Sequence, residues 1–193
     1  MGEPRNIFFL TCDTFGVLPP IAWLTPAMAS YHFLAGFTAK VAGTEAGVVT
    51  PAPTFSPCFG APFMPLEPVV YARLLEERLV RGQTQCWLVN TGWSGGPYGV
   101  GKRMRISLMR DVLTAVLDGS LDKVEFTPHP VFRVLVPTTC KGVPERLLDP
   151  RATWKDPGEY DARAAEVAQH FAAAFARFAG RVPADVAAAA PVA

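Results

Sequence analysis

Short continuous apolar runs mark the predicted strands of this chain. Residues 7–10 (IFFL) and 85–90 (QCWLVN) are apolar for most of their length, which is typical of strands covered on both faces. Further strands are predicted at residues 124–126 and 131–136. The first run lies only a few residues into the chain, so we expect residues 7–10 to form an exposed strand edge. Such an edge works against folding of the chain by itself.

Apolar residues three and four positions apart mark the predicted helices. Thr25 followed by Pro26 is a good helix start, because a hydroxyl can cap the first amides and proline suits the first turn. Pro68 opens another helix, and Gly82 is its expected C-cap. The predicted helices span residues 26–43, 68–82, 106–117 and 157–179. Six prolines in residues 44–68 predict little regular structure there, and the alternation of strands and helices elsewhere predicts an α/β fold.

Composition narrows the class of protein. With 193 residues, 50% apolar and 18% charged, the chain can bury a sizeable core and suits a single domain, which we assign to residues 1–182. The Ala, Pro and Val residues of 183–193 predict a disordered tail. A net charge of +1 does not indicate a protein that binds nucleic acid or an anionic membrane through an excess of positive charge.

The cysteines and the hydropathy pattern indicate a soluble cytoplasmic protein. The four cysteines are far apart in sequence, which favours buried reduced thiols over a zinc site. Neither a secretory signal nor an apolar window long enough to span a membrane is found. The histidines do not belong to any recognisable catalytic or metal-binding arrangement in the sequence. We interpret His32, inside a predicted helix, as packed or surface-exposed. We interpret His129, between two prolines, as a residue of a turn or strand edge.

The best candidate for chemistry is the glycine-rich stretch 91–104, TGWSGGPYGVGKRM, between a predicted strand and a predicted helix. In such a loop the backbone can approach a phosphate or a nucleotide. Residues 96–102 fit the pattern G-x-x-x-x-G-K of a phosphate loop, but Arg103 stands where that motif needs Ser or Thr for magnesium. Nucleotide contact and a purely structural connection both remain open on this evidence.

Longer segments carry a close family resemblance. The chain resembles the C-terminal portion of ATP-dependent phosphoenolpyruvate carboxykinase, in the right order from residue 6 to about residue 182. The matching segments are 6–20 (NIFFLTCDTFGVLPP), 31–45 (YHFLAGFTAKVAGTE), 54–63 (TFSPCFGAPF), 88–104 (LVNTGWSGGPYGVGKRM) and 148–151 (LDPR). The resemblance implies a mixed sheet with helices, forming the C-terminal part of the family's nucleotide-binding catalytic domain.

The resemblance also implies an activity and its site. The family converts oxaloacetate and ATP to phosphoenolpyruvate, CO2 and ADP in gluconeogenesis, with a divalent metal (Mn or Mg). It assigns Arg103 and Met104 to an Arg-Ile or Arg-Met pair that contacts the nucleotide near its base and ribose. Met109 occupies a nucleotide-contacting position that is usually Thr. Two other departures are Ala46 in place of Arg and Glu67 in place of His.

The family's phosphate loop, metal ligands and oxaloacetate-binding arginines lie upstream of the matched segments, so no catalytic or metal residue is assigned here. We therefore expect the chain to be inactive alone and to bind ATP weakly. The alternative is a non-catalytic remnant, or one half of a split gene that docks onto a separate N-terminal half. An independent phosphate-loop kinase using Lys102 is a third, less favoured hypothesis.

Overall fold

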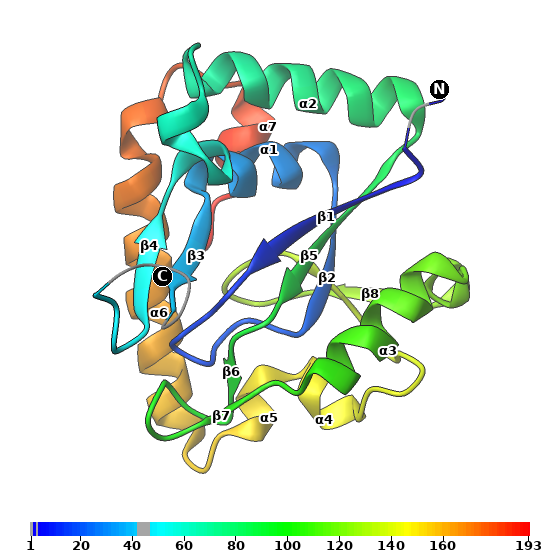
Figure 1. The fold of residues 1–193 in the computed structure, drawn as a ribbon, viewed down its shortest axis with the longest axis vertical. Coiled ribbons are helices and arrows are strands. Elements are labelled where there is room, and N and C mark those ends of the chain that lie inside the picture. Colours follow the sequence, from blue (N-terminus) through cyan, green and yellow to red (C-terminus); the bar gives the residue numbers. More distant parts are fainter. Residues whose placement is uncertain (1, 3, 42–46) are drawn as a thin grey trace.

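A five-stranded sheet forms the centre of the molecule in this computed structural model, which describes residues 2, 4–41 and 47–193 (Figure 1). The strands follow the order β1-β5-β2-β9-β8. They are β1 (Asn6–Thr11), β2 (Ile21–Leu24), β5 (Gln85–Asn90), β8 (Phe126–Pro128) and β9 (Leu135–Pro137). The β1–β5 pair is parallel, and every other neighbouring pair is antiparallel. The prediction of an α/β fold with a mixed sheet is confirmed.

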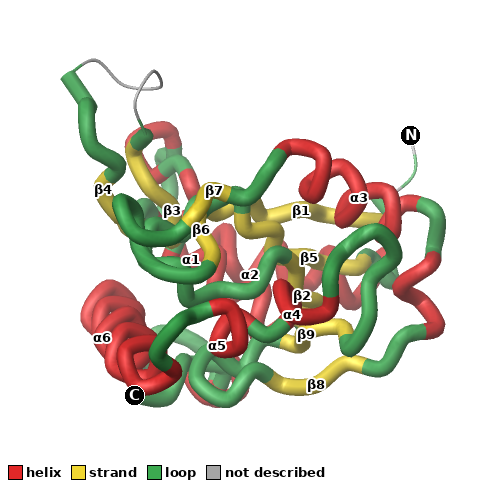
Figure 2. Tube along the Cα trace, turned by 90° about the horizontal axis from the view of Figure 1, so that it is seen from below, coloured by secondary structure: helices red, strands yellow, loops and turns green. Residues whose placement is uncertain are grey.

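Helices cover both faces of this sheet. Figure 2 shows the strands running from β1 at one edge to β8 at the other. In Figure 1, α1, α2 and α7 lie above the sheet, α3, α4 and α5 lie below it, and α6 runs down one side. The helices are α1 (Pro26–Ala35), α2 (Pro68–Gly82), α3 (Ile106–Leu117), α4 (Glu145–Leu148), α5 (Pro150–Thr153), α6 (Pro157–Phe175) and α7 (Ala184–Ala188).

Several predicted elements are confirmed at their boundaries. Strand β5 and helices α2 and α3 have the predicted bounds, but the C-cap of α2 is Gln83, in a left-handed conformation at φ +48°, and not Gly82 as predicted. Helix α1 begins as expected, with the Thr25 hydroxyl accepting a hydrogen bond from the Met28 amide. It ends at Ala35 rather than near residue 43, because Gly36 adopts a left-handed conformation at φ +57° and closes the helix.

Other parts of the prediction were wrong. The run 37–40 leaves the helix to form β3 (Phe37–Lys40), which pairs with β4 (Ala52–Phe55) inside the proline-rich stretch. Strand β2 was not predicted, since its four residues lie between a proline pair and the start of a helix. Strand β8 lies two residues later than expected, whereas β9 begins at Leu135 and overlaps only the end of the predicted run 131–136. The long helix predicted to residue 179 ends at Phe175, followed by a 3-10 turn.

The C-terminal segment is ordered, contrary to our expectation for residues 183–193. It forms α7, whose Val186 is 1% exposed and packs with the main hydrophobic core. The Arg133 guanidinium donates a hydrogen bond of 2.8 Å to the carbonyl of Ala188. Val186 and the buried Ala189 attach this short helix to the core, although its composition resembles that of a tail.

Strand β1 lies at the edge of the sheet, as expected for residues 7–10. It is not covered on both faces, although its apolar run is typical of such strands. Leu10 is 58% exposed, whereas Phe9, on the opposite face of the strand, is buried.

None of the helices in the described part of the chain is long and apolar enough to cross a membrane.

Candidate nucleotide site

Two loops leave the sheet side by side, because β1 and β5 are parallel and end at the same edge. Thr91, just after β5, donates hydrogen bonds from its backbone N–H (2.8 Å) and its hydroxyl (3.0 Å) to the carbonyl of Thr11 at the end of β1. The loops are residues 12–20 and 91–104. Ligands of open α/β sheets bind outside such carboxyl ends of strands, so this is where a site is expected.

Asp13 organises the first loop from inside the protein. Its side chain is fully buried, and its carboxylate accepts three backbone hydrogen bonds, from Phe15 (2.8 Å), Val17 (2.7 Å) and Leu18 (2.8 Å). Burial raises the pKa of the Asp13 carboxyl, and the backbone donors act in the opposite direction. These bonds hold the loop in one conformation.

Asn90 connects the first loop to the second. Its side-chain oxygen accepts hydrogen bonds from the Asp13 amide (3.0 Å) and the Gly92 amide (2.9 Å), and its NH2 group donates to the Leu18 carbonyl (3.0 Å). Asn90 is fully buried. Asp13 and Asn90 were both missed by sequence reasoning, although a polar residue directly after an apolar strand was the available signal.

Glycines allow the two loops to touch backbone to backbone. A Cβ atom on Gly92 would lie 2.1 Å from the Asp13 carbonyl oxygen. A Cβ on Gly16 would lie 2.2 Å, and one on Gly101 2.1 Å, from the carbonyl oxygen of Gly96. Gly92 and Gly101 of the second loop are therefore required by close packing within the protein, independently of any phosphate.

Most backbone amides of the glycine-rich loop already have protein acceptors. The bonds are Trp93 to Asp13 O (2.9 Å), Gly95 to Thr153 Oγ1 (3.0 Å), Tyr98 to Thr14 O (2.8 Å), Val100 to Pro97 O (3.0 Å), Gly101 to Pro97 O (2.8 Å) and Met104 to Gly92 O (2.9 Å). A phosphate loop needs such amides directed at the anion. The segment 96–102 therefore differs from a phosphate cradle, despite its sequence pattern.

Arg103 is exposed but held at the surface of this loop. It lies on β7 (Lys102–Arg103), which pairs with β6 (Trp93–Ser94) as a short hairpin. Its Nε donates a hydrogen bond of 3.2 Å to the carbonyl of Thr91, and its guanidinium lies 5.4 Å from the ring centre of the buried Trp93. The cation–π contact and the hydrogen bond together fix the position of the charge.

The other two predicted nucleotide residues have different environments. Met104 follows Arg103 directly, is half-buried and packs against the core, so the structure keeps these two residues together on the loop. Met109 lies one turn into α3 and is only 9% exposed, within the hydrophobic core. A thioether at this position fills space, whereas a hydroxyl would need a hydrogen-bond partner.

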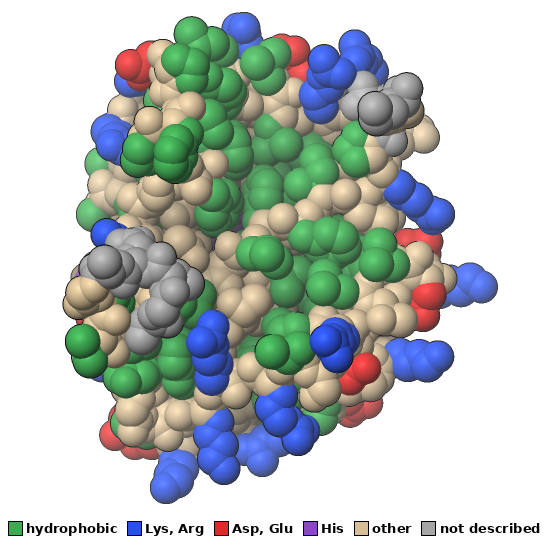
Figure 3. All heavy atoms as spheres, viewed as in Figure 1, with side chains coloured by type: hydrophobic (Ala, Val, Ile, Leu, Met, Phe, Trp, Pro, Cys, Tyr) green, Lys and Arg blue, Asp and Glu red, His purple; other side chains and the backbone are tan. Residues whose placement is uncertain are grey.

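Positive charge gathers beside the glycine-rich loop. Figure 3 shows Lys and Arg side chains grouped at the lower end of the molecule, around β7 and the start of α3. The exposed basic residues of this segment are Lys102, Arg103, Arg105 and Arg110. Such a concentration attracts anions to this end of the sheet even though the net charge of the chain is only +1.

Aromatic residues from the C-terminal half support the Asp13 loop from its other side. The Trp154 indole donates a hydrogen bond of 2.9 Å to the Gly16 carbonyl, and the Tyr160 hydroxyl donates one of 3.0 Å to the Val17 carbonyl. The Tyr160 oxygen in turn lies 2.9 Å from His129 Nε2. The bonds of Trp154 and Tyr160 to the Asp13 loop join residues more than 130 positions apart and had no signal in the sequence.

His129 is a structural residue, as its position in a turn suggested. Its Nδ1 accepts backbone hydrogen bonds from Val131 (3.2 Å) and Phe132 (3.1 Å), so the Nε2 carries the proton toward Tyr160. Burial lowers the pKa of His129 to about 4. It lines a cavity of about 660 Å³ between the β8–β9 turn and α4 to α6, together with Asp149 and Arg151.

His32 is packed in the core, as predicted. It is 3% exposed, its ring meets that of Phe171 edge-on at 5.6 Å, and burial lowers its pKa to about 4. Its Nε2 has no hydrogen-bond partner among the described residues.

Of the two other departures from the family pattern, Glu67 accepts a surface hydrogen bond of 2.9 Å from Arg181, and Ala46 lies outside the described residues.

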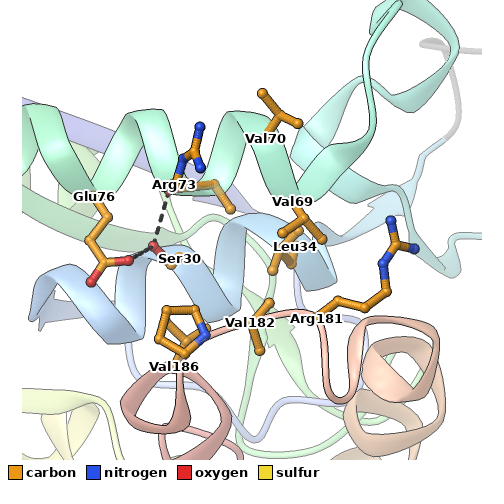
Figure 4. A pocket seen from close by; sticks show the side chains of 11 residues that line it. Ser30, Leu34, Val69, Val70, Arg73, Glu76, Arg181, Val182 and Val186 are labelled. Atoms are coloured by element: carbon orange, nitrogen blue, oxygen red, sulfur yellow. Dashed lines mark hydrogen bonds between the residues drawn. The ribbon is translucent and has the colours of Figure 1, made fainter.

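A smaller cavity of about 180 Å³ lies between α1, α2 and the segment leading into α7, on the helices above the sheet (Figure 4). Its walls are mainly apolar, including Leu34, Val69 and Val186. The Ser30 hydroxyl points toward Glu76 and lies 3.5 Å from its carboxylate. Burial, aided by Asp185, raises the pKa of Glu76. This cavity is a seam between helices and is separate from the two loops.

The side chains of the described residues do not fit a divalent metal. Among the described residues, no group of three or more His, Cys, Asp or Glu side chains could hold a metal ion. The four cysteines are free, buried and separate, in agreement with the interpretation as reduced thiols. The carboxylate nearest the loops, Asp13, has its oxygens occupied by backbone N–H groups.

Comparison with known proteins assigns the family. A family model described as phosphoenolpyruvate carboxykinase matches residues 1–146. A phosphoenolpyruvate carboxykinase (ATP) of Cereibacter sphaeroides is 59% identical over 189 residues, covering 98% of this chain and 36% of the relative. The enzymes of the same name from Paracoccus denitrificans (56% over 189 residues) and Flavobacterium johnsoniae (53% over 190 residues) give the same coverage of both chains.

The present chain thus spans 36% of the length of the curated relatives that it matches. Nearly all of its residues take part in the match, including both loops and the Arg103–Met104 pair. The chain belongs to the phosphoenolpyruvate carboxykinase family.

Proposed function

We propose that this chain supplies the base side of the ATP site of a phosphoenolpyruvate carboxykinase. The reaction is the conversion of oxaloacetate and ATP to phosphoenolpyruvate, CO2 and ADP, in the cytoplasm. The observation that carries the proposal is the fixed, exposed guanidinium of Arg103, on interlocked loops at the carboxyl ends of two parallel strands. Membership of the family supports the same assignment.

The proposed chemistry of Arg103 is stacking and hydrogen bonding. A planar guanidinium can lie on an adenine ring and also donate to the base or the ribose. Met104 follows Arg103 directly and offers a half-buried apolar side chain, and Met109 is the third residue assigned to the nucleotide, from its core position in α3. Because Met109 stands where the family usually has Thr, one hydrogen bond is absent, at a cost of about 0.5–1.5 kcal/mol of binding energy.

The phosphates and the metal require other parts of the polypeptide. Most of the loop amides are engaged within the protein, and the described residues do not form a metal site. Phosphoryl transfer depends mainly on positioning and charge neutralisation, so the base side alone gives no turnover. We therefore propose that Mn or Mg and the triphosphate are held by segments of the enzyme outside this chain.

Binding of separate pieces of ATP tests the base-side assignment. In an NMR titration of the labelled 193-residue chain, adenosine should shift the amide signals of residues 91–104, with an affinity of about 1 mM. Arg103→Ala should remove this response. Arg105→Ala is the matched control, since Arg105 is an exposed arginine two residues away that is not held against Thr91 and Trp93.

The opposite pattern would refute the proposal. If tripolyphosphate at physiological salt shifts the loop amides while adenosine does not, the loop holds phosphates. A loss of magnesium-ATP binding in Lys102→Ala would support the independent kinase, whereas unchanged binding would exclude it.

A non-catalytic protein is the second candidate, favoured by the departures at Ala46, Glu67 and Met109 from the family pattern. A split enzyme and a remnant differ in one measurable respect. The split enzyme regains turnover when the missing part of the polypeptide is added, and the remnant does not.

A further inference from the structure

The two edges of the sheet differ in their protection against other strands. Strand β8 has only three residues, contains Pro128 and is followed by Pro130. Short edge strands and prolines are common devices against unwanted pairing. Strand β1, at the other edge, has six residues of sequence NIFFLT, with neither proline nor a charged residue. It is an open pairing edge.

The free backbone groups of β1 can be identified from its pairing with β5. The carbonyls of Arg5 and Thr11 accept hydrogen bonds from Gln85 (2.9 Å) and Thr91 (2.8 Å). In a parallel ladder the residues that bond to one neighbour are two positions apart. Odd-numbered residues of β1 therefore face β5, and Asn6, Phe8 and Leu10 direct their N–H and C=O groups away from the sheet.

Apolar side chains flank this edge on both faces of the sheet. On the face toward α1, Phe9 stacks with Phe33 and contacts Phe59, at centroid distances of 5.8 and 5.3 Å. On the face toward α3, Leu10 is 58% exposed, and Ile106 of α3 is 72% exposed. In Figure 3, hydrophobic side chains lie on both sides of the path that β1 follows in Figure 1.

We propose that β1 is a docking edge, which accepts an extended segment of phosphoenolpyruvate carboxykinase polypeptide from outside this chain. The match covers only 36% of the relatives, so most of such a polypeptide is available to supply the strand. Parallel strands are normally covered on both faces, and an added strand would bring side chains over Leu10 and beside Phe33. The inference rests on the proposed function, because it takes the missing part of the enzyme as the partner.

Co-expression provides the test. The 193-residue chain is produced together with the Cereibacter sphaeroides enzyme from which the 189 matched residues have been removed. We expect the two polypeptides to co-purify as a one-to-one complex. In hydrogen exchange, the amides of Phe8 and Leu10 should become protected on complex formation, while those of Ile7 and Phe9 are already protected in the chain alone.

Proline provides a selective variant. Leu10→Pro removes an outward N–H and leaves the β1–β5 ladder intact, so it should weaken the complex more than about tenfold. Leu10→Ala is the matched control: it removes the apolar side chain but keeps the N–H, and should weaken the complex less than Leu10→Pro. Unfolding curves of both variants establish that the chain itself remains folded.

Each contrary result has a distinct meaning. Co-purification without protection of Phe8 and Leu10, or equal complex formation by Leu10→Pro, would overturn the docking edge while leaving the proposed function untouched. Protection of these amides in a dimer of the chain alone would overturn the choice of partner in favour of a second copy. A β1-docked complex that fails to turn over substrate would support the docking edge and refute the proposed function.

Discussion

Asp13 is a carboxylate without exposed surface, held by three backbone N–H groups of its own loop. Removing a charge from water costs several kcal/mol unless hydrogen bonds replace the hydration. Here the compensation comes from amides that would otherwise be unpaired in a tight loop. The same residue accepts the Trp93 amide, so the position of Arg103, which lies against Trp93, depends on Asp13 indirectly.

Gly92→Ala should destabilise the fold. The new Cβ would lie 2.1 Å from the Asp13 carbonyl oxygen, and both partners are backbone held by Asn90. Overpacking of this kind costs about 1–3 kcal/mol or more. Chemical denaturation measures the change in the free energy of unfolding.

Gly158→Ala is the control for this substitution. It lies in the first turn of α6, where an added Cβ meets only the flexible Asp156 carboxylate at 3.2 Å. Its unfolding free energy should stay within about 0.5 kcal/mol of the parent, since alanine also favours the helix. Equal losses in the two variants would contradict the close-packing explanation of the loop glycines.

Acid should destabilise the protein through His32 and His129. Burial lowers the pKa of each to about 4, from an ordinary value of 6.5. Between these pH values the unfolded chain binds more protons than the folded one, so stability is lost as the pH falls. Each histidine contributes up to about 3 kcal/mol across this window.

The difference in the free energy of unfolding between the parent and His32→Leu, followed as a function of pH, isolates the contribution of His32. The variant replaces a buried ring whose Nε2 is without a partner among the described residues by an apolar side chain. Unfolding free energies measured from pH 7 to pH 4 should fall less steeply for the variant. A constant difference between the two proteins at all pH values would show that His32 does not titrate in this range.

At the scale of elements, α7 shows how little sequence signal an ordered helix needs. The helix has five residues, four of which are Ala or Asp, and its attachment comes from Val186 and the Arg133–Ala188 hydrogen bond. It covers α1 and closes the apolar seam between α1 and α2. The segment is therefore part of the domain rather than an appendage.

Val186→Asp should destabilise the chain by about 3 kcal/mol or more, because it places an unpaired charge at a buried site. Ala187→Asp, one residue later on an exposed position of the same helix, should have little effect. The midpoint temperatures of thermal unfolding of the two variants, each compared with that of the parent, measure the difference. If both variants behave like the parent, α7 does not pack on the domain in solution.

At the scale of the whole molecule, one hydrophobic core supports a site that, as proposed, forms only part of an enzyme's nucleotide site. Helices cover both faces of the sheet, yet β1 is open and the described residues contain no metal-binding group. A folded module that presents one side of a nucleotide site accounts for both features. Under the proposed function, its contribution to catalysis is positional and requires the remaining polypeptide.

The purified chain alone should form no phosphoenolpyruvate from oxaloacetate, ATP and Mn or Mg. Addition of the unmatched part of the Cereibacter sphaeroides enzyme should restore turnover, and Arg103→Ala should lower it in the restored complex. A coupled assay for phosphoenolpyruvate measures both. Turnover by the chain alone would mean that it holds phosphate and metal groups after all.

Local patterns in the sequence predicted the elements whose periodicity is strong. Strand β5 and helices α2 and α3 follow from apolar spacing, and the start of α2 follows also from Pro68; both signals act over a few residues. The glycine-rich loop and Arg103 were likewise evident from the sequence, and the resemblance carried by 88–104 identified the family that the comparisons then established. These features depend on neighbours in the chain.

Tertiary structure alone decided the remainder. Whether the amides of 92–104 were free for a phosphate depended on Asp13, Thr14 and Thr153, which only the fold brings to the loop. The support of the Asp13 loop by Trp154 and Tyr160, and the attachment of α7 through Val186, likewise join distant segments. Close packing and buried hydrogen bonds are long-range in sequence, so a local pattern cannot encode them.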